Sequence, residues 1–224
     1  MGERIGGAVF GVLQLILHLV FGWPAYLLWG ATGGRARGVT NHFIPFPPFV
    51  NGDPGKRLFP GVHKRKVLLS NVGIVGTLVL LGMACVKFGV LRVMAVYAAP
   101  LLVVNAWLVG YTWLQHTSSD VPHFDKDDES YNFVKGGFLT IDRPYGPVLD
   151  FLHHRIGSTH VVHHLDPTIP FYHAKEATDA IQEAFPDLYL RDPTPIHEAL
   201  WDVAKHCAVA EKRGSDGMWV FANS

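Results

Sequence analysis

Six of the chain's thirteen histidines lie between His153 and His173, and three of them form an H-x-x-H-H pattern. The three are His160, His163 and His164. Residues at i, i+3 and i+4 share one face of a helix, so the spacing predicts three imidazoles on the same side. Neutral imidazole binds iron, zinc, copper or nickel, whereas hard cations prefer oxygen. The pattern therefore predicts a transition-metal site, and three exposed helix histidines that bind nothing are the alternative.

Two long apolar segments precede these histidines and predict a membrane-spanning helical hairpin. Residues 67–86 and 93–114 contain no charged side chain, and each has about the length that a membrane span needs. Only residues 87–92 separate the segments, which predicts a tight turn. Five basic residues between positions 56 and 66 precede the hairpin, whereas its turn holds two. The positive-inside rule therefore places both outer ends of the hairpin, and everything after residue 115, in the cytosol.

The first apolar segment, over residues 5–29, is also able to enter a bilayer. The sequence G-W-P at 22–24 predicts an interruption of its helix, because proline lacks an N–H and clashes with the preceding turn. We expect this helix to lie in one leaflet, with a full span as the alternative. The membrane region then covers about residues 5–115, and residues 116–224 form a cytosolic, histidine-rich helical cap.

The composition agrees with an integral membrane protein of the all-α class. Apolar residues make up 49% of the chain and charged residues 17%, and the mean hydropathy is +0.18. The formal net charge is zero, so the chain shows no electrostatic footprint of a nucleic-acid partner. The sequence contains no glycine-rich phosphate loop, so it does not predict a nucleotide site. We expect one domain over residues 1–224.

Several motifs resemble the membrane fatty acid desaturases, and most closely their acyl-lipid omega-6 (delta-12) and omega-3 group. T-H-V-V-H-H-L at 159–165 and I-P-F-Y-H-A-K-E-A-T at 169–178 resemble the third histidine box of that group. F-G-W-P-A-Y-L at 21–27, Y-T-W-L-Q-H-T at 111–117 and L-T-I-D-R-P-Y-G at 139–146 match it in the same order. The family's two earlier histidine boxes do not occur ahead of these motifs, so the resemblance implies the C-terminal half of a desaturase.

The resemblance also implies which side chains bind metal. In this family a histidine at the end of the second hairpin helix helps to bind metal, which implies that role for His116. The implied ligands are then His116, His160, His163 and His164. Side chains of adjacent helix residues diverge by about 100°, so His163 and His164 could serve different irons. Further candidates for a ligand or supporting role are His154, His123, His173 and Asp142.

Asp142 has three candidate roles in the sequence. Metal-bound histidines usually donate their other N–H to a carboxylate or a carbonyl, so Asp142 could orient a ligand imidazole. An ion pair with the adjacent Arg143 and a helix cap are the alternatives.

The implied activity is desaturation of an acyl chain esterified in a membrane lipid. It requires two non-haem irons, O2 and electrons from cytochrome b5, and the cytochrome would be separate because the chain holds no haem motif of that kind. The resemblance implies residence in the endoplasmic reticulum. Four ligands cannot surround two irons, so we expect the site of this chain to be incomplete.

Other functions fit the same residues. A hydroxylase, acetylenase or conjugase could use the same scaffold, and a desaturase fragment could be non-catalytic. A membrane zinc hydrolase needs only three protein ligands, but no glutamate lies between the histidines as it does in H-E-x-x-H proteases. Phe171 and Asp166 depart from the usual downstream motif, so the sequence leaves omega-6 and omega-3 chemistry open.

Overall fold

The computed structural model describes residues 6–30, 40–49, 57–124, 132–213 and 218–221, which fall into two compact units. The hairpin unit covers Ile16–Val109, and the histidine unit covers Met1–Leu15 together with Gly110–Ser224. That the two fold as one domain over residues 1–224 stays a prediction.

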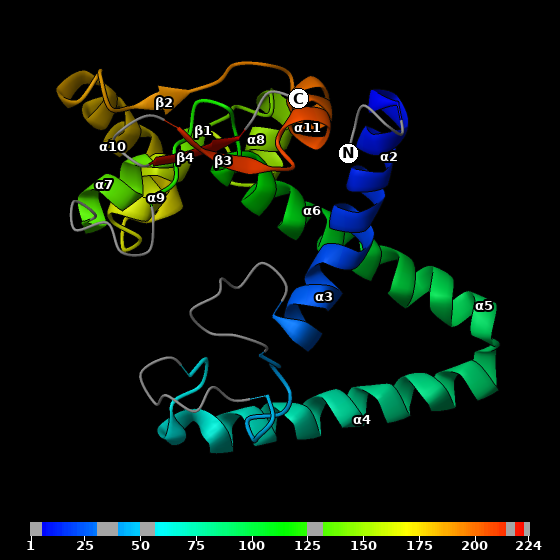
Figure 1. Cartoon of the computed structure of the whole chain (residues 1–224). Helices are drawn as coiled ribbons and strands as arrows, with labels where there is room; N and C mark the ends of the chain where they lie inside the picture. Colours follow the sequence, from blue (N-terminus) through cyan, green and yellow to red (C-terminus); the bar gives the residue numbers. More distant parts are fainter. Residues whose placement is uncertain (1–5, 31–39, 50–56, 125–131, 214–217, 222–224) are drawn as a thin grey trace. The chain divides into compact units, whose positions relative to one another are not determined.

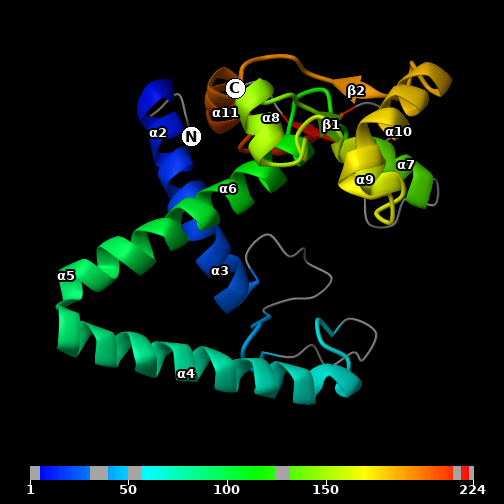
Figure 2. The ribbon, with the colours of Figure 1, turned by 180° about the vertical axis from the view of Figure 1, so that it is seen from behind.

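The hairpin unit consists of helices. Its elements are η1 (Leu17–Phe21), α3 (Gly22–Trp29), η3 (Gly61–His63), α4 (Lys64–Phe88), α5 (Val90–Val93) and η4 (Met94–Ala98), while α2 (Gly7–Ile16) and α6 (Ala99–His116) cross its boundaries. The chain turns back where α4 meets α5 (Figures 1 and 2). The order of these elements confirms the predicted hairpin.

Within the described residues, three helical stretches are long and apolar enough to cross a membrane. They are Gly7–Trp29, Gly61–Phe88 and Val90–His116. Large apolar side chains are exposed along α4, and the exposed fraction reaches 68% at Val72 and 90% at Val86. Apolar surface on this scale is costly in water but not in hydrocarbon. The stretches therefore confirm the prediction of a membrane protein.

The turn of the hairpin is shorter than the sequence predicts. Residues 87–92 were expected to connect the two spans, but α4 runs to Phe88 and α5 begins at Val90. Gly89 between them has a φ of 88° and a ψ of 140°. A residue with a Cβ rarely adopts a positive φ, so glycine allows the chain to change direction within one residue.

The α-helical pattern of the first apolar segment is interrupted directly before the G-W-P sequence, but the backbone stays helical through it. Helical backbone runs from Gly7 to Trp29, and its π-helical stretch, η1, ends just before α3. In an α-helix the Val20 carbonyl would accept from residue 24, but Pro24 has no N–H to donate. The side chain of Asn105 from α6 supplies a donor instead, with its Nδ2 2.6 Å from the Leu19 oxygen and 3.3 Å from the Val20 oxygen.

The histidine unit is mostly helical and also holds two short strand pairs. Its elements are α7 (Phe133–Phe138), β1 (Ile141–Asp142), α8 (Pro147–Leu152), α9 (His160–Leu165), α10 (Phe171–Ala184), β2 (Leu190–Arg191), α11 (Ile196–His206), β3 (Ala210–Arg213) and β4 (Met218–Phe221). β1 pairs in parallel with β2, and β3 pairs antiparallel with β4. The all-α prediction is confirmed as the dominant class, and the four strands are an addition to it.

The core of this unit joins the end of α6 to α11. Leu114, Tyr145, Ala199, Val203 and Cys207 are buried there in one apolar cluster. Burial raises the pKa of the Cys207 thiol to about 11, so the thiol stays protonated at neutral pH.

Gly157 joins the end of α6 to the segment after β1. Its carbonyl accepts hydrogen bonds from the Gln115 Nε2 at 2.6 Å and from the Arg143 N–H at 2.7 Å. A Cβ at this position would lie 2.5 Å from the Arg143 oxygen and 2.7 Å from the Cζ of Tyr145. Backbone and a buried ring cannot move aside easily, so the position requires glycine.

Replacing Asn105 should destabilise the hairpin unit. In Asn105→Ala the Leu19 and Val20 carbonyls lose their donor in an apolar setting, and we expect a loss of about 1–2 kcal/mol in the free energy of unfolding. Titration with a denaturing detergent, followed by circular dichroism, measures it. Val104→Ala is the matched control, because this neighbouring side chain is 61% exposed. Equal stability of Asn105→Ala and the unaltered chain would contradict the role of Asn105.

Gly157→Ala should destabilise the histidine unit by about 2–3 kcal/mol, because the new methyl group meets backbone and a buried ring. Thermal melting in detergent reports this as a lower Tm. Gly7→Ala is the control, since a Cβ there would meet its nearest neighbour, Cε of Lys205, at an ordinary 3.7 Å. The explanation fails if both variants melt at the same temperature.

Candidate metal centre

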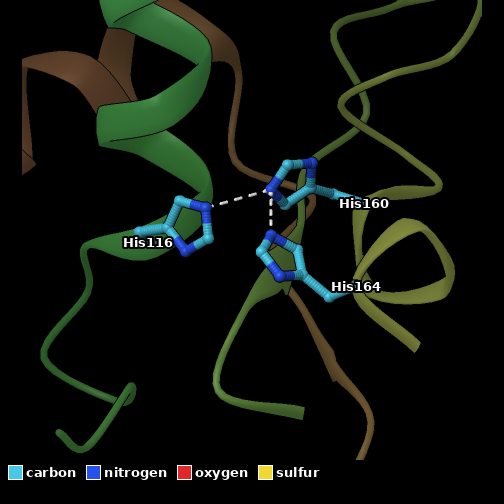
Figure 3. A group of neighbouring side chains, drawn as sticks. All are labelled: His116, His160 and His164. Atoms are coloured by element: carbon cyan, nitrogen blue, oxygen red, sulfur yellow. Dashed lines mark hydrogen bonds between the residues drawn. The ribbon is translucent and has the colours of Figure 1, made fainter. Parts of the chain in front are cut away.

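The candidate metal centre is built from two helix ends in the histidine unit. His116 is the last residue of α6, and the six-residue helix α9 begins at His160. The H-x-x-H-H spacing brings His160 and His164 one above the other on α9. The three side chains point toward one another (Figure 3).

The Nε2 atom of His160 lies between the other two imidazoles. It is 3.2 Å from the Nε2 of His116 and 3.1 Å from the Nε2 of His164. One nitrogen from each ring lies within 4.8 Å of the others. An imidazole nitrogen carries either one proton or one lone pair, so His160 cannot pair fully with both neighbours at once. The set of donors fits a metal ion, to which all three nitrogens can offer lone pairs.

The environment keeps these imidazoles uncharged. His160 is 7% exposed. Burial, and then the neighbouring imidazoles of His116 and His164, lower the pKa of His160 to about 2. Burial and the neighbouring His163 also lower the pKa of His164. The neutral form is the one that binds metal, so both side chains are competent ligands at neutral pH.

The carboxylate of Asp142 holds the first turn of α9. Its Oδ1 accepts the backbone N–H groups of His160 at 2.7 Å and of Val161 at 2.9 Å, while its Oδ2 accepts the hydroxyl of Tyr189 at 2.7 Å. Burial raises the pKa of Asp142, and the hydrogen bonds from Tyr189, Val161 and His160 act in the opposite direction. Asp142 lies in β1, so it contacts the first turn of α9 from outside the helix and not as its N-cap residue, which is Thr159. A role of Asp142 in orienting a ligand imidazole stays a prediction.

Tyr189 is a supporting residue that the sequence did not indicate. It precedes β2, whose Arg191 pairs with Asp142 of β1. No local motif marks Tyr189, because its partner lies 47 residues earlier in the chain. The two-residue strand pairing that brings them together is too short to leave a pattern in the sequence.

His163 lies outside the three-nitrogen group and lines a neighbouring cavity. The cavity has a volume of about 430 Å³. Its polar lining includes His153, His154 and His163, and its apolar lining includes Val162 and Ile169. The His154 ring lies 4.4 Å from the ring of Phe171 between centroids. Ligand roles for His163 and His154 stay predictions.

The other two candidate histidines lie elsewhere in the unit. His123 exchanges backbone hydrogen bonds with Trp219, and its ring contacts Phe221 edge-on at 5.3 Å. Burial lowers the pKa of His123. The side chain of His173 is 61% exposed, with its Nδ1 3.6 Å from a carboxylate oxygen of Glu176. Supporting roles for His123 and His173 stay predictions.

Comparison with known proteins places the chain in a family. A model of the fatty acid desaturase family matches residues 22–194. The chain is 36% identical to a Delta(12) fatty acid desaturase of Mortierella alpina over 89% of its own length and 47% of the relative. It is also 36% identical to an oleoyl-12-hydroxylase of Ricinus communis, over 89% of its length and 49% of the relative.

A Delta(12) acyl-lipid conjugase of Momordica charantia is 35% identical, over 92% of this chain and 49% of the relative. The chain thus spans about half the length of the curated relatives that it matches. No solved structure matches it. Because the family model covers most of the chain, including the helix ends that carry the three clustered histidines, this protein belongs to the fatty acid desaturase family.

Proposed function

We propose that this chain supplies one wall of the metal site of an enzyme that introduces a cis double bond into acyl chains of membrane lipids. The observation that carries the proposal is the convergence of His116, His160 and His164 in a chain of this family. The Delta(12) relatives favour the delta-12 (omega-6) position, with omega-3 chemistry as the related option.

The chemistry requires an oxidant that no side chain provides. Bound iron would supply it by activating O2 for removal of hydrogen from an unactivated C–H bond. His116, His160 and His164 hold their lone pairs in place for one iron of a two-iron centre. His163, which is adjacent to His164 but lines the cavity, is proposed as a ligand of the second.

The setting of the cluster suits a lipid substrate. His116 ends the apolar stretch Val90–His116, so the imidazoles follow directly on a candidate membrane span. An acyl chain in the bilayer can approach such a position without entering water. The basic residues before α4 favour a cytosolic location for this end of the span, where cytochrome b5 would act as a separate electron donor. Residence in the endoplasmic reticulum belongs to the same proposal.

Hydroxylation is the second candidate function. The oleoyl-12-hydroxylase of Ricinus communis is as similar to this chain as the Delta(12) desaturase of Mortierella alpina is. Both outcomes begin with removal of a hydrogen from the acyl chain, so the same three imidazoles serve either. Expression in yeast of this chain joined to the N-terminal part of the Mortierella alpina desaturase that it does not match, with gas chromatography of the membrane-lipid acyl chains, tests the function. A new diene supports desaturation, a hydroxy acid supports hydroxylation, and unchanged lipids contradict both.

Replacing a histidine of the cluster should remove bound iron. We expect His160→Ala or His164→Ala to lower the iron content of the purified protein to background, because two imidazoles cannot retain the ion in competition with buffer. Elemental analysis by mass spectrometry measures the iron. His173→Ala is the control, since His173 is exposed and lies outside the cluster. Equal iron in all the proteins would refute the assignment of the ligands.

Removing the carboxylate of Asp142 should weaken the site without removing a ligand. Asp142→Ala leaves the N–H groups of His160 and Val161 without their acceptor, and we expect iron affinity to fall roughly 10- to 100-fold. Asp142→Asn keeps an acceptor oxygen and should lose less. Competition with a calibrated chelator measures the affinity. Asp179→Asn, on the exposed face of α10, should have no effect, and an equal loss there would exclude positioning by Asp142.

A further inference from the structure

A second cavity lies entirely within the hairpin unit, where α4 begins. Its volume is about 520 Å³. Its walls come from the last turn of α3, the loop at residues 40–49, Phe59 and the first turns of α4. The residues of α4 and its N-cap that line this groove are His63, Lys66, Val67, Ser70, Asn71 and Ile74.

Specific contacts hold the walls of this groove in place. The Nδ2 of Asn71 donates to the Phe43 carbonyl at 2.6 Å, which fixes the loop against α4. The His42 N–H donates to the Leu27 carbonyl at 2.9 Å, and its ring lies 4.8 Å from Tyr26 and 5.7 Å from Phe59 between centroids. The His42 Nδ1 is buried and has no hydrogen-bond partner among the described residues. These contacts hold the loop and α3 against the beginning of α4 around the groove.

The charged lining residue lies where α4 begins. His63 and Lys66 lie there, Val67, Ser70 and Asn71 follow within about one turn, and Ile74 is one turn further along the helix. Eight residues of helix separate Lys66 from Ile74, which is about 12 Å at 1.5 Å per residue. The polar layer of a bilayer leaflet is about 5–8 Å thick. With Lys66 at the surface of the membrane, Ile74 reaches the hydrocarbon.

The positive charge beside the groove favours a ligand with an anionic group. Lys64, Arg65 and Lys66 are consecutive at the beginning of α4, and the ammonium of Lys64 lies over the ring of Phe46 at 5.5 Å. The described residues of the hairpin unit include no aspartate or glutamate. The positive charge beside the groove therefore has no carboxylate partner in that part of the chain, and an anionic group complements it.

We propose that this groove binds one glycerophospholipid, with its phosphate beside Lys66 and His63 and an acyl chain along Val67 and Ile74. A phospholipid carries an anionic phosphate and hydrocarbon chains in one molecule, so it can reach both Lys66 and Ile74, which are about 12 Å apart along α4. The side chains, rather than the helix terminus alone, define the site. The inference uses only the hairpin unit and does not depend on the proposed function.

The test measures lipid binding to the purified, delipidated chain in a neutral maltoside detergent. Dioleoylphosphatidylglycerol is titrated in, and native mass spectrometry counts the bound lipid. We expect one saturable lipid per chain and a roughly fivefold weaker affinity in Lys66→Gln, because one basic residue contributes about 1 kcal/mol to attraction by an anionic lipid. Lys66→Arg should restore the affinity, and Ser70→Phe should block binding by filling the groove.

Lys87→Gln is the matched control, since it removes the same charge from the same helix outside the groove. Equal weakening by Lys87→Gln and Lys66→Gln would overturn the proposal in favour of non-specific attraction. Inorganic phosphate and dioleoylglycerol separate the two halves of the ligand, and each alone should bind much more weakly than the phospholipid. Phosphate that binds as tightly as the lipid would show a free-anion site instead. Circular dichroism of each variant confirms that it is folded.

Discussion

The histidine unit depends on one carboxylate, that of Asp142. The N–H groups in the first turn of a helix have no partner within the helix, and Thr159 makes no side-chain cap for α9. Asp142 accepts two of these N–H groups, and its negative charge also favours the N-terminal end of the helix dipole. An isolated helix of six residues is not stable in water. The position of His160 is therefore set by a residue that does not touch its imidazole.

The sequence predicted the candidate site where the determinants are local. The spacing of His160, His163 and His164 requires nothing beyond helix geometry, and the motif at the end of α6 indicated His116. The divergence of His163 from His164 follows from the angle of about 100° between adjacent helix residues, but which of the two lies with His160 and His116 could not be predicted. The position of His116 at the end of α6 decides which histidines of α9 it meets. That position depends on a tertiary contact between His116 and His160, which are 44 residues apart in the chain.

The fold shows the same division between local and distant causes. Length and apolar composition predicted the hairpin, because a membrane span is a local property. The interruption predicted at Pro24 is confined to the π-helical stretch Leu17–Phe21, because Asn105, about 85 residues away, donates to the carbonyls of Leu19 and Val20. In an apolar setting every backbone carbonyl needs a donor. A polar side chain in one apolar helix can therefore supply a donor to the backbone of another helix, and the sequence of either helix alone does not predict this contact.

The hydrogen-bonding needs of the three imidazoles suggest a reason for their arrangement. Three neutral imidazoles crowded around one nitrogen leave at least one buried polar group poorly satisfied, which costs stability without a metal. The Nδ1 of His160 adds to this cost, because it is buried with no partner among the described residues. A bound cation would use the lone pairs that cannot pair with one another, so the arrangement suits a set of metal ligands. Relatives named as desaturase, hydroxylase and conjugase resemble this chain to nearly the same degree. Under the proposed function the cluster holds the metal whichever product forms, and the difference in product is expected to come from other side chains.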